Sequence, residues 1–90
     1  MTTPSREPHL RLEILRLLDA CEGYLLPQTT MRNHLCLLMA PAPGEGEFRS
    51  ALDALTKQSL AVSVNSALGG EPRWKITDQG RAILLEHLRP

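Results

Sequence analysis

The chain has 90 residues, with ten Lys or Arg and ten Asp or Glu side chains, so its formal net charge is zero. This length favours a single domain with one modest core, and an apolar content of 42% excludes a disordered chain. Aromatic residues make up only 3% of the sequence, so Leu, Ile and Val must fill the core. A dedicated nucleic-acid-binding protein is usually basic, which makes the neutral charge informative.

The sequence contains no apolar run near the roughly 20 residues that a membrane span needs, and residues 1–7 lack the apolar segment of a signal peptide. These features predict a cytoplasmic protein with no membrane partner, in which Cys21 and Cys36 are reduced thiols. The Cys and His residues show no spacing typical of a metal site. We therefore expect no metal, no cofactor and no enzymatic activity.

The first half of the chain predicts two helices joined by a short strand. Residues 1–8 are expected to form a loose tail, and a helix then runs to about residue 21. The apolar residues 24–26 suit an edge strand that pairs with a later hairpin. A second helix is expected to be capped by Thr29 or Thr30. The apolar stripes at helical spacing are Leu10, Ile14, Leu17, Leu18 and Cys21 in the first helix, and Met31, Leu35, Leu38 and Met39 in the second.

The middle of the chain predicts a third helix followed by a strand. Prolines and glycines interrupt the helical pattern between residues 40 and 47. The pattern then resumes and runs to Ser59, with Phe48, Ala51, Leu52 and Leu55 facing inward and Arg49, Ser50, Asp53 and Lys57 facing outward. The alternation of Leu60, Val62 and Val64 with smaller or polar residues predicts a half-buried strand with these three inside. Gly69 and Gly70 lie in the turn that follows.

The stretch after this turn predicts a second strand of the hairpin. Trp74 and Ile76 alternate with Arg73 and Lys75, which gives the strand an apolar face and a basic face. We expect this strand to pair antiparallel with residues 60–65. Trp74 should then lie in the core, although an exposed stacking role for its ring is an alternative.

The strand is predicted to run directly into the final helix, over residues 78–88. The hydroxyl of Thr77 can accept a hydrogen bond from the first turn of that helix, and Asp78 places a negative charge near its positive end. Glycine inside a helix costs about 1 kcal/mol relative to alanine. We therefore interpret Gly80 as a position where the helix approaches the strand behind it closely.

The order helix, strand, helix, helix, strand, strand, helix resembles that of the winged helix-turn-helix family. The resemblance covers residues 9–88, and its most specific parts are the transition over residues 52–64 and the pattern Trp74-x-Ile76-Thr77-x-x-Gly80. It implies one domain that is mainly α with a small β-sheet, in the order α-β-α-α-β-β-α. The layout is also similar to small regulators of bacteria and their prophages.

In this family the third helix usually enters the DNA major groove and the hairpin, called the wing, touches the DNA backbone. The resemblance thus implies that the protein binds double-stranded DNA sequence-specifically, as a small transcription regulator. By position, Arg49 and Ser50 would contact bases. Lys57, Arg73 and Lys75 would contact phosphates.

Two features favour a different function, a non-catalytic protein-interaction module in an assembly. The loop before the third helix is longer than the three or four residues typical of a helix-turn-helix. Glu45, Glu47 and Asp53 also place carboxylates on or near the reading helix, where they repel phosphates unless they are paired. The neutral net charge leaves both hypotheses open.

A surplus of leucines on the first and last helices predicts a homodimer. Leu12 and Leu15 lie away from the stripe of the first helix, and Leu85 and Leu88 spread around the last one. Apolar patches on soluble proteins usually mark interfaces. The alternative is that the two terminal helices cover each other within one chain.

Overall fold

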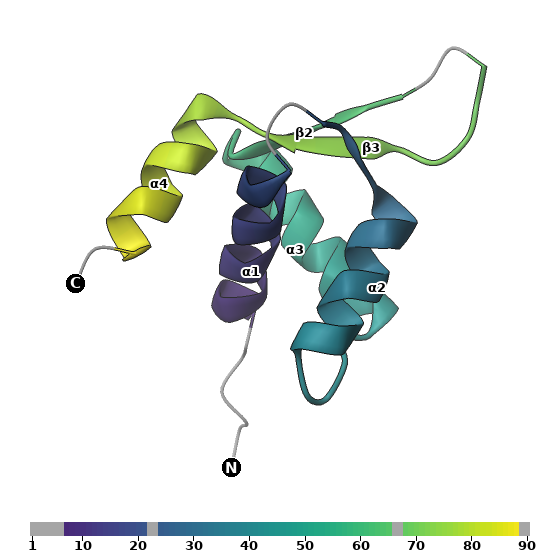
Figure 1. Ribbon diagram of the computed structural model, residues 1–90, viewed down its shortest axis with the longest axis horizontal. Helices are drawn as coiled ribbons and strands as arrows, with labels where there is room; N and C mark the ends of the chain where they lie inside the picture. The colour runs from purple at the N-terminus through teal and green to yellow at the C-terminus, as the bar shows by residue number, and fades with distance from the viewer. Residues whose placement is uncertain (1–6, 22–23, 66–67, 89–90) are drawn as a thin grey trace.

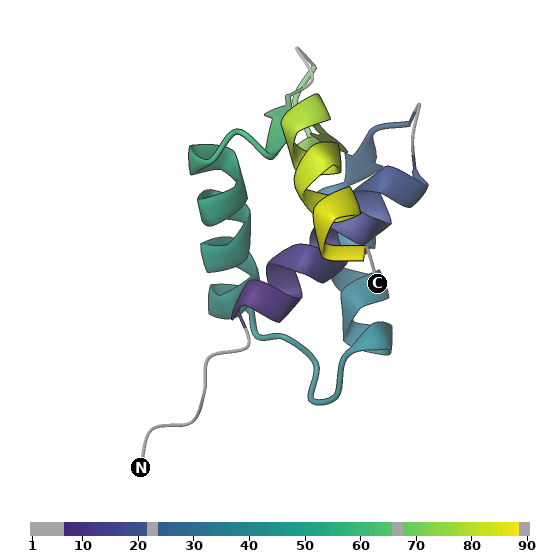
Figure 2. The same ribbon diagram turned by 90° about the vertical axis from the view of Figure 1, so that its left-hand side faces the viewer.

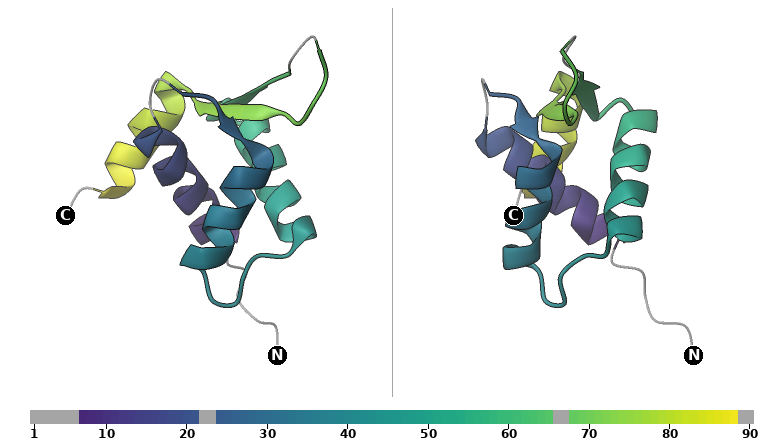
Figure 3. Two further views of the ribbon diagram at one scale, coloured as in Figure 1. Left: turned by 45° about the vertical axis from the view of Figure 1, so that its right-hand side comes forward. Right: turned by 90° about the vertical axis from the view of Figure 1, so that its right-hand side faces the viewer.

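The computed structural model describes residues 7–21, 24–65 and 68–88. The helices α1, α2 and α3 lie on one side of a small sheet, and α4 leaves the end of the sheet opposite the projecting β2–β3 hairpin (Figures 1 and 3). The elements are α1 (Glu7–Ala20), β1 (Leu26–Pro27), α2 (Gln28–Leu38), α3 (Glu45–Lys57), β2 (Ala61–Val64), β3 (Arg73–Ile76) and α4 (Asp78–Leu88). This order confirms the one expected from the sequence.

The boundaries differ slightly from the predicted ones at the start of the chain. Helix α1 begins at Glu7, inside the predicted tail, and the rest of that tail lies outside the described residues. Residues 39–44 separate α2 from α3, which confirms a loop longer than a typical helix-turn-helix turn. In the described part of the chain, no helix is both long and apolar enough to cross a membrane.

The sheet has β3 in its centre, paired antiparallel with β1 on one side and β2 on the other. The register places Trp74 opposite Leu26 of β1 and opposite Ser63 of β2. The predicted hairpin and the predicted edge strand are therefore both confirmed. Since both β1 and β2 pair with β3, the position of β3 determines where these two strands lie.

The structure corrects the prediction of which side of β2 faces the core. Trp74 is buried, and Ser63 lies directly opposite it, so the two side chains share a face of the sheet. Ala61, two residues earlier on that face, is fully buried. The prediction that Val62 and Val64 point inward is wrong, because the register pairs them with the exposed Lys75 and Arg73 on the other face of the sheet.

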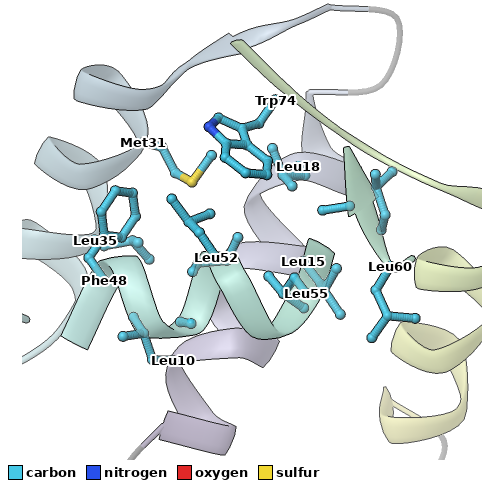
Figure 4. Packing of buried hydrophobic residues seen from close by; sticks show 14 of the residues in the cluster. Leu10, Leu15, Leu18, Met31, Leu35, Phe48, Leu52, Leu55, Leu60 and Trp74 are labelled. Atoms are coloured by element: carbon cyan, nitrogen blue, oxygen red, sulfur yellow. The ribbon is translucent and has the colours of Figure 1, made fainter. Parts of the chain in front are cut away.

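Trp74 belongs to the core, as the alternating pattern predicted. Its side chain is 7% exposed and lies near Met31 of α2 and Leu18 of α1 (Figure 4). The indole Nε1 donates a hydrogen bond of 3.2 Å to Oε1 of Gln28, so its polar atom is satisfied. The ring therefore connects the sheet to two helices.

The inward face of α3 agrees with the sequence, whereas one residue of α2 does not. The four predicted core residues of α3 are buried, namely Phe48, Ala51, Leu52 and Leu55. In α2, Met31 and Leu35 are buried as predicted, but Leu38 is 56% exposed. The helix ends at Leu38, and Met39 turns into the core in an extended conformation in its place.

The end of α3 is closed by a Schellman arrangement of hydrogen bonds. The backbone N–H of Ser59 donates to the carbonyl of Thr56 at 3.0 Å, and that of Leu60 donates to the carbonyl of Leu55 at 2.9 Å. Ser59 adopts the left-handed conformation that this turn requires, with φ of 59°. Leu55 and Leu60 are both buried, which supplies the apolar contact that accompanies such a turn.

The start of α4 is attached to this same turn. Thr77 Oγ1 accepts a hydrogen bond of 2.9 Å from the backbone N–H of Gly80, which confirms the predicted cap. The Thr77 hydroxyl also donates to the carbonyl of Ser59 at 2.7 Å, and its backbone N–H donates to the carbonyl of Leu60 at 3.1 Å. A Cβ at position 80 would lie 2.0 Å from the Leu60 carbonyl oxygen, which confirms the interpretation of Gly80 as a site of close approach.

We therefore expect Gly80→Ala to lower the free energy of unfolding by about 1–3 kcal/mol, because the backbone of Leu60 must shift to admit the new methyl group. This loss should appear although alanine is the better helix former by about 1 kcal/mol. Urea denaturation followed by circular dichroism measures it. Gly46→Ala in α3 is the matched control, because a Cβ there meets no other atom of the described chain within 4 Å. A Gly80→Ala variant as stable as Gly46→Ala would contradict the close approach.

Candidate nucleic-acid interface

The exposed face of α3 carries the residues that the sequence placed there. The four predicted outward residues are all exposed in the structure: Arg49, Ser50, Asp53 and Lys57. Buried residues on the opposite face hold the helix against α1 and the start of β2. Helix α3 is thus an anchored element with one polar surface available to a partner.

The two carboxylates at the start of α3 are both engaged within the chain. Glu47 Oε1 accepts a hydrogen bond of 3.2 Å from the backbone N–H of Gly44, which closes the first turn of the helix. Glu45 Oε1 lies 3.7 Å from Arg49 Nη2. Both side chains of this pair are largely exposed, so the pair is worth at most about 1 kcal/mol and Arg49 can leave it for a better acceptor.

A polar groove of about 450 Å³ separates α2 from α3 beside Arg49. The residues that line it are Gln28, Thr29, Arg32, Asn33 and Cys36 of α2, and Glu45, Phe48 and Arg49 of α3. The sequence analysis missed Arg32 and Asn33 as site residues. Their position on the polar side of α2, away from Met31 and Leu35, was the signal that could have identified them.

The amino end of α2 is held by the hairpin. Residue Pro27 precedes the helix and offers no side-chain cap, so the prediction that Thr29 or Thr30 caps α2 is wrong. Instead the Glu71 carboxylate accepts a hydrogen bond of 3.0 Å from the backbone N–H of Thr29, and another from the Thr29 hydroxyl. An acidic group at the positive end of a helix is stabilising, and here the loop that precedes β3 supplies it.

These hydrogen bonds set the ionisation of Glu71. The hydroxyl and then the backbone N–H of Thr29 lower the pKa of the Glu71 carboxyl below its ordinary value of 4.5, and the nearby Arg73 guanidinium lowers the pKa further. A lowered pKa in the folded state means that ionised Glu71 stabilises the fold at neutral pH. That stability is lost as the pH falls below 4.5 and through the folded-state pKa.

We accordingly expect Glu71→Gln to lower the melting temperature at pH 7, because the amide gives α2 no negative charge. The difference from the unmodified chain should shrink as the pH falls below 4.5, where Glu71 itself becomes neutral. Thermal unfolding at a series of pH values checks this. Glu86→Gln, an exposed position on α4, is the control. A difference that stays constant between pH 7 and pH 3 would show that the charge of Glu71 plays no part.

The structure groups some of the predicted DNA-binding residues and separates others. Arg49 and Arg32 line the α2–α3 groove, and Arg73 lies beside Glu71, whose carboxylate binds Thr29 at one end of that groove. We refer to Arg32, Arg49 and Arg73 as the arginine strip.

The other predicted residues lie elsewhere. Lys75 lines a hollow with Tyr24 and Arg81, where α1 ends and α4 begins. Ser50 lines a shallow hollow with Glu7 and Glu47, whose carboxylates are unfavourable neighbours for a phosphate. Lys57 is exposed in the last turn of α3, whereas Glu45 and Arg49 lie near the start of the same helix.

The leucines predicted to form a dimer interface differ in how deeply they are buried. Leu15 is 2% exposed and belongs to the core, so its assignment to the interface is wrong; it packs within the single chain, as the alternative held. Leu12 is half-buried against the core, whereas Leu85 is 56% exposed. The side chain of Leu88 lies outside what the structure describes.

Cys21 and Cys36 are half-buried free thiols. Within residues 7–21, 24–65 and 68–88, no group of three or more His, Cys, Asp or Glu side chains could hold a metal ion.

Neither a protein-family model nor a curated protein matches this sequence. Among the solved structures that are similar to it are three whose similarity covers about nine-tenths of this chain. A candidate transcriptional regulator from Thermoplasma acidophilum has a TM-score of 0.76 at 19% identity, covering 91% of this chain and 79% of its own. A PadR-like transcription factor from Bacteroides fragilis has a TM-score of 0.71 at 22% identity, with the same coverage. A PadR-like transcriptional regulator from Bacillus cereus has a TM-score of 0.72 at 21% identity, covering 90% and 79%.

The chain has a winged-helix fold. The similarity extends over nine-tenths of its length, so it includes the hairpin and α4 as well as the three central helices. In the terms of this fold, α2 and α3 are the helix-turn-helix pair and β2–β3 is the wing. The arginine strip then follows the groove between that pair and the base of the wing.

Proposed function

We propose that this winged helix is a sequence-specific DNA-binding module that acts as a small transcription regulator in the cytoplasm. The observation that carries the proposal is the arginine strip: Arg32 and Arg49 line the groove beside the exposed face of α3, and Arg73 lies near Glu71, which binds Thr29 at one end of that groove. The similar structures are themselves described as transcriptional regulators or a transcription factor. A basic strip beside an exposed helix is the footprint expected of a DNA-binding surface.

In this proposal α3 enters the major groove and the DNA backbone runs along the α2–α3 groove. Arg49 exchanges its weak contact with Glu45 for the O6 and N7 atoms of a guanine. Asp53, one helical turn further on, suits the amino group of a cytosine. Arg32 and Arg73 contact phosphates, which position the protein on the duplex.

Three further residues have lesser parts in the proposal. Lys57 and Lys75 add phosphate contacts at the end of α3 and on the outer face of the wing, and Ser50 adds an adaptable hydrogen bond. Their separation from the arginine strip makes them less central than Arg32. With few phosphate contacts and a neutral chain, binding should be modest in strength, and its salt dependence should be shallow because the slope scales with the number of phosphate contacts.

We expect Arg49→Ala to cost about 1–3 kcal/mol of binding free energy and to relax specificity at one base pair. Arg32→Gln should weaken binding to all sequences alike and reduce the salt slope by about one. Fluorescence anisotropy with genomic fragments at several salt concentrations measures both effects. Arg16→Gln is the control, since Arg16 lies on α1 and pairs with Glu13.

Two exposed leucines favour the protein-interaction alternative. Leu37 is 87% and Leu38 is 56% exposed at the end of α2, where neighbouring apolar side chains suit a protein surface better than DNA. The anisotropy experiment separates the two functions. If even non-specific binding is absent at low salt, the DNA-binding proposal fails and the protein-interaction hypothesis is favoured.

We also propose that the module works as a homodimer through α4. Leu85 stays exposed on α4, and half-buried Leu12 lies on the facing helix α1. Burying one leucine is worth roughly 1.5–3 kcal/mol, so a twofold contact that buries Leu85 and Leu88 of both copies would offset part of the cost of association. A dimer would place two copies of α3 for symmetric half-sites.

Leu85→Glu should shift the protein toward the monomer, because the contact would then bury two carboxylates. Sedimentation equilibrium at micromolar concentration measures the shift. Leu37→Glu, equally apolar and more exposed but on α2, is the matched control. A protein that is monomeric before any substitution, or a dimer that tolerates Leu85→Glu, would contradict the α4 interface.

A further inference from the structure

A second groove lies between α1, the end of α3 and α4, and it shares no lining residue with the α2–α3 groove. Its volume is about 340 Å³, near the lower end of the roughly 300–1,000 Å³ of ligand pockets. The residues that line it are Pro8, His9, Arg11, Leu12, Leu15, Leu55, Gln58, Leu60, Ile83 and His87. Such a volume fits a small ligand.

The groove exists because α4 is held at its start and crosses α1 at an angle (Figure 2). Gly80 presses the first turn of α4 against Leu60, and Leu84 fills the contact with the core. Arg81 Nε then donates to Asp19 Oδ1 at 3.0 Å, which ties this turn to the far end of α1. The early part of α1 is consequently covered only in part by Ile83 of α4.

The groove has an apolar floor and a polar rim. Its floor is made of aliphatic side chains from both terminal helices, from α3 and from the turn between α3 and β2. Arg11, His9 and His87 stand at its rim. No Asp or Glu is among the described residues that line it. Arg11 supplies a fixed positive charge at this rim.

One nitrogen of the Arg11 side chain has no hydrogen-bond acceptor within the described chain. This atom, Nε, is buried. A buried donor of this kind costs free energy until an acceptor reaches it. A groove with an aliphatic floor and a guanidinium at its edge, one nitrogen of which has no hydrogen-bond partner in the described chain, is complementary to a molecule with an apolar body and an anionic end.

We propose that this groove binds a small amphipathic anion, an alkyl chain that ends in a single carboxylate. The chain lies along Leu12, Leu55 and Ile83, and the carboxylate accepts hydrogen bonds from Arg11. Leu85, the exposed leucine of the proposed α4 contact, does not line the groove. The ligand would contact α1 and α4 together and so hold the angle between them.

The test is a titration of ¹⁵N-labelled protein with octanoate, followed by the amide signals in two-dimensional NMR spectra. Saturable shifts are expected at Leu12, Ile83 and His87. Octanol, which has the same chain and no charge, should bind at least about tenfold more weakly. The assay contains no DNA, so its outcome is independent of the proposed regulatory function.

Arg11→Gln should weaken octanoate binding about tenfold and leave octanol binding unchanged. Arg16→Gln on the exposed side of α1 is the matched control and should change neither. The spectra report whether each variant is folded. If Arg11→Gln does not fold, the comparison of octanoate with octanol on the unmodified chain still tests the proposal. Absence of saturable shifts, equal affinity for octanoate and octanol, or an unaffected Arg11→Gln variant would each overturn the proposal.

Discussion

The rest of the structure depends on the contact between the first turn of α4 and the turn that joins α3 to β2. Thr77 donates to two consecutive carbonyls of that turn, those of Ser59 and Leu60, and its hydroxyl also caps α4. The absence of a side chain at Gly80 lets the helix come close enough for these bonds to form. One junction therefore fixes the end of α3, the start of β2 and the direction of α4.

The central strand β3 is held at both ends by polar contacts to helices. At its far end Thr77 meets the α3–β2 turn, and at its near end the Glu71 carboxylate and the Pro72 carbonyl accept hydrogen bonds from the first turn of α2. Between them Trp74 packs into the core and donates to Gln28. These contacts attach β3 both to α2 and to the turn that ends α3, so the wing and the helix-turn-helix pair are joined by hydrogen bonds at both ends of the strand.

This arrangement also explains how a neutral chain can present a basic surface. Glu47 closes the first turn of α3, Glu71 holds α2, and Asp19 pairs with Arg81 between α1 and α4. These carboxylates are engaged in maintaining the fold. The guanidinium of Arg32 has no such internal partner at its Nε within the described chain, and that of Arg49 has a weak one. Net charge alone therefore understates the positive character of the α2–α3 groove.

The sequence by itself determined the order of elements, the inward face of α3, the burial of Trp74 and the special place of Gly80, since each follows from periodicity or from a local backbone need. It also identified Arg49 and Arg73 as candidate site residues. Tertiary structure decided the inward face of β2, the burial of Leu15 and the partner that caps α2. Each of these depends on what lies opposite. Strand register, helix crossing and a carboxylate 42 residues from the N–H that donates to it leave no local pattern.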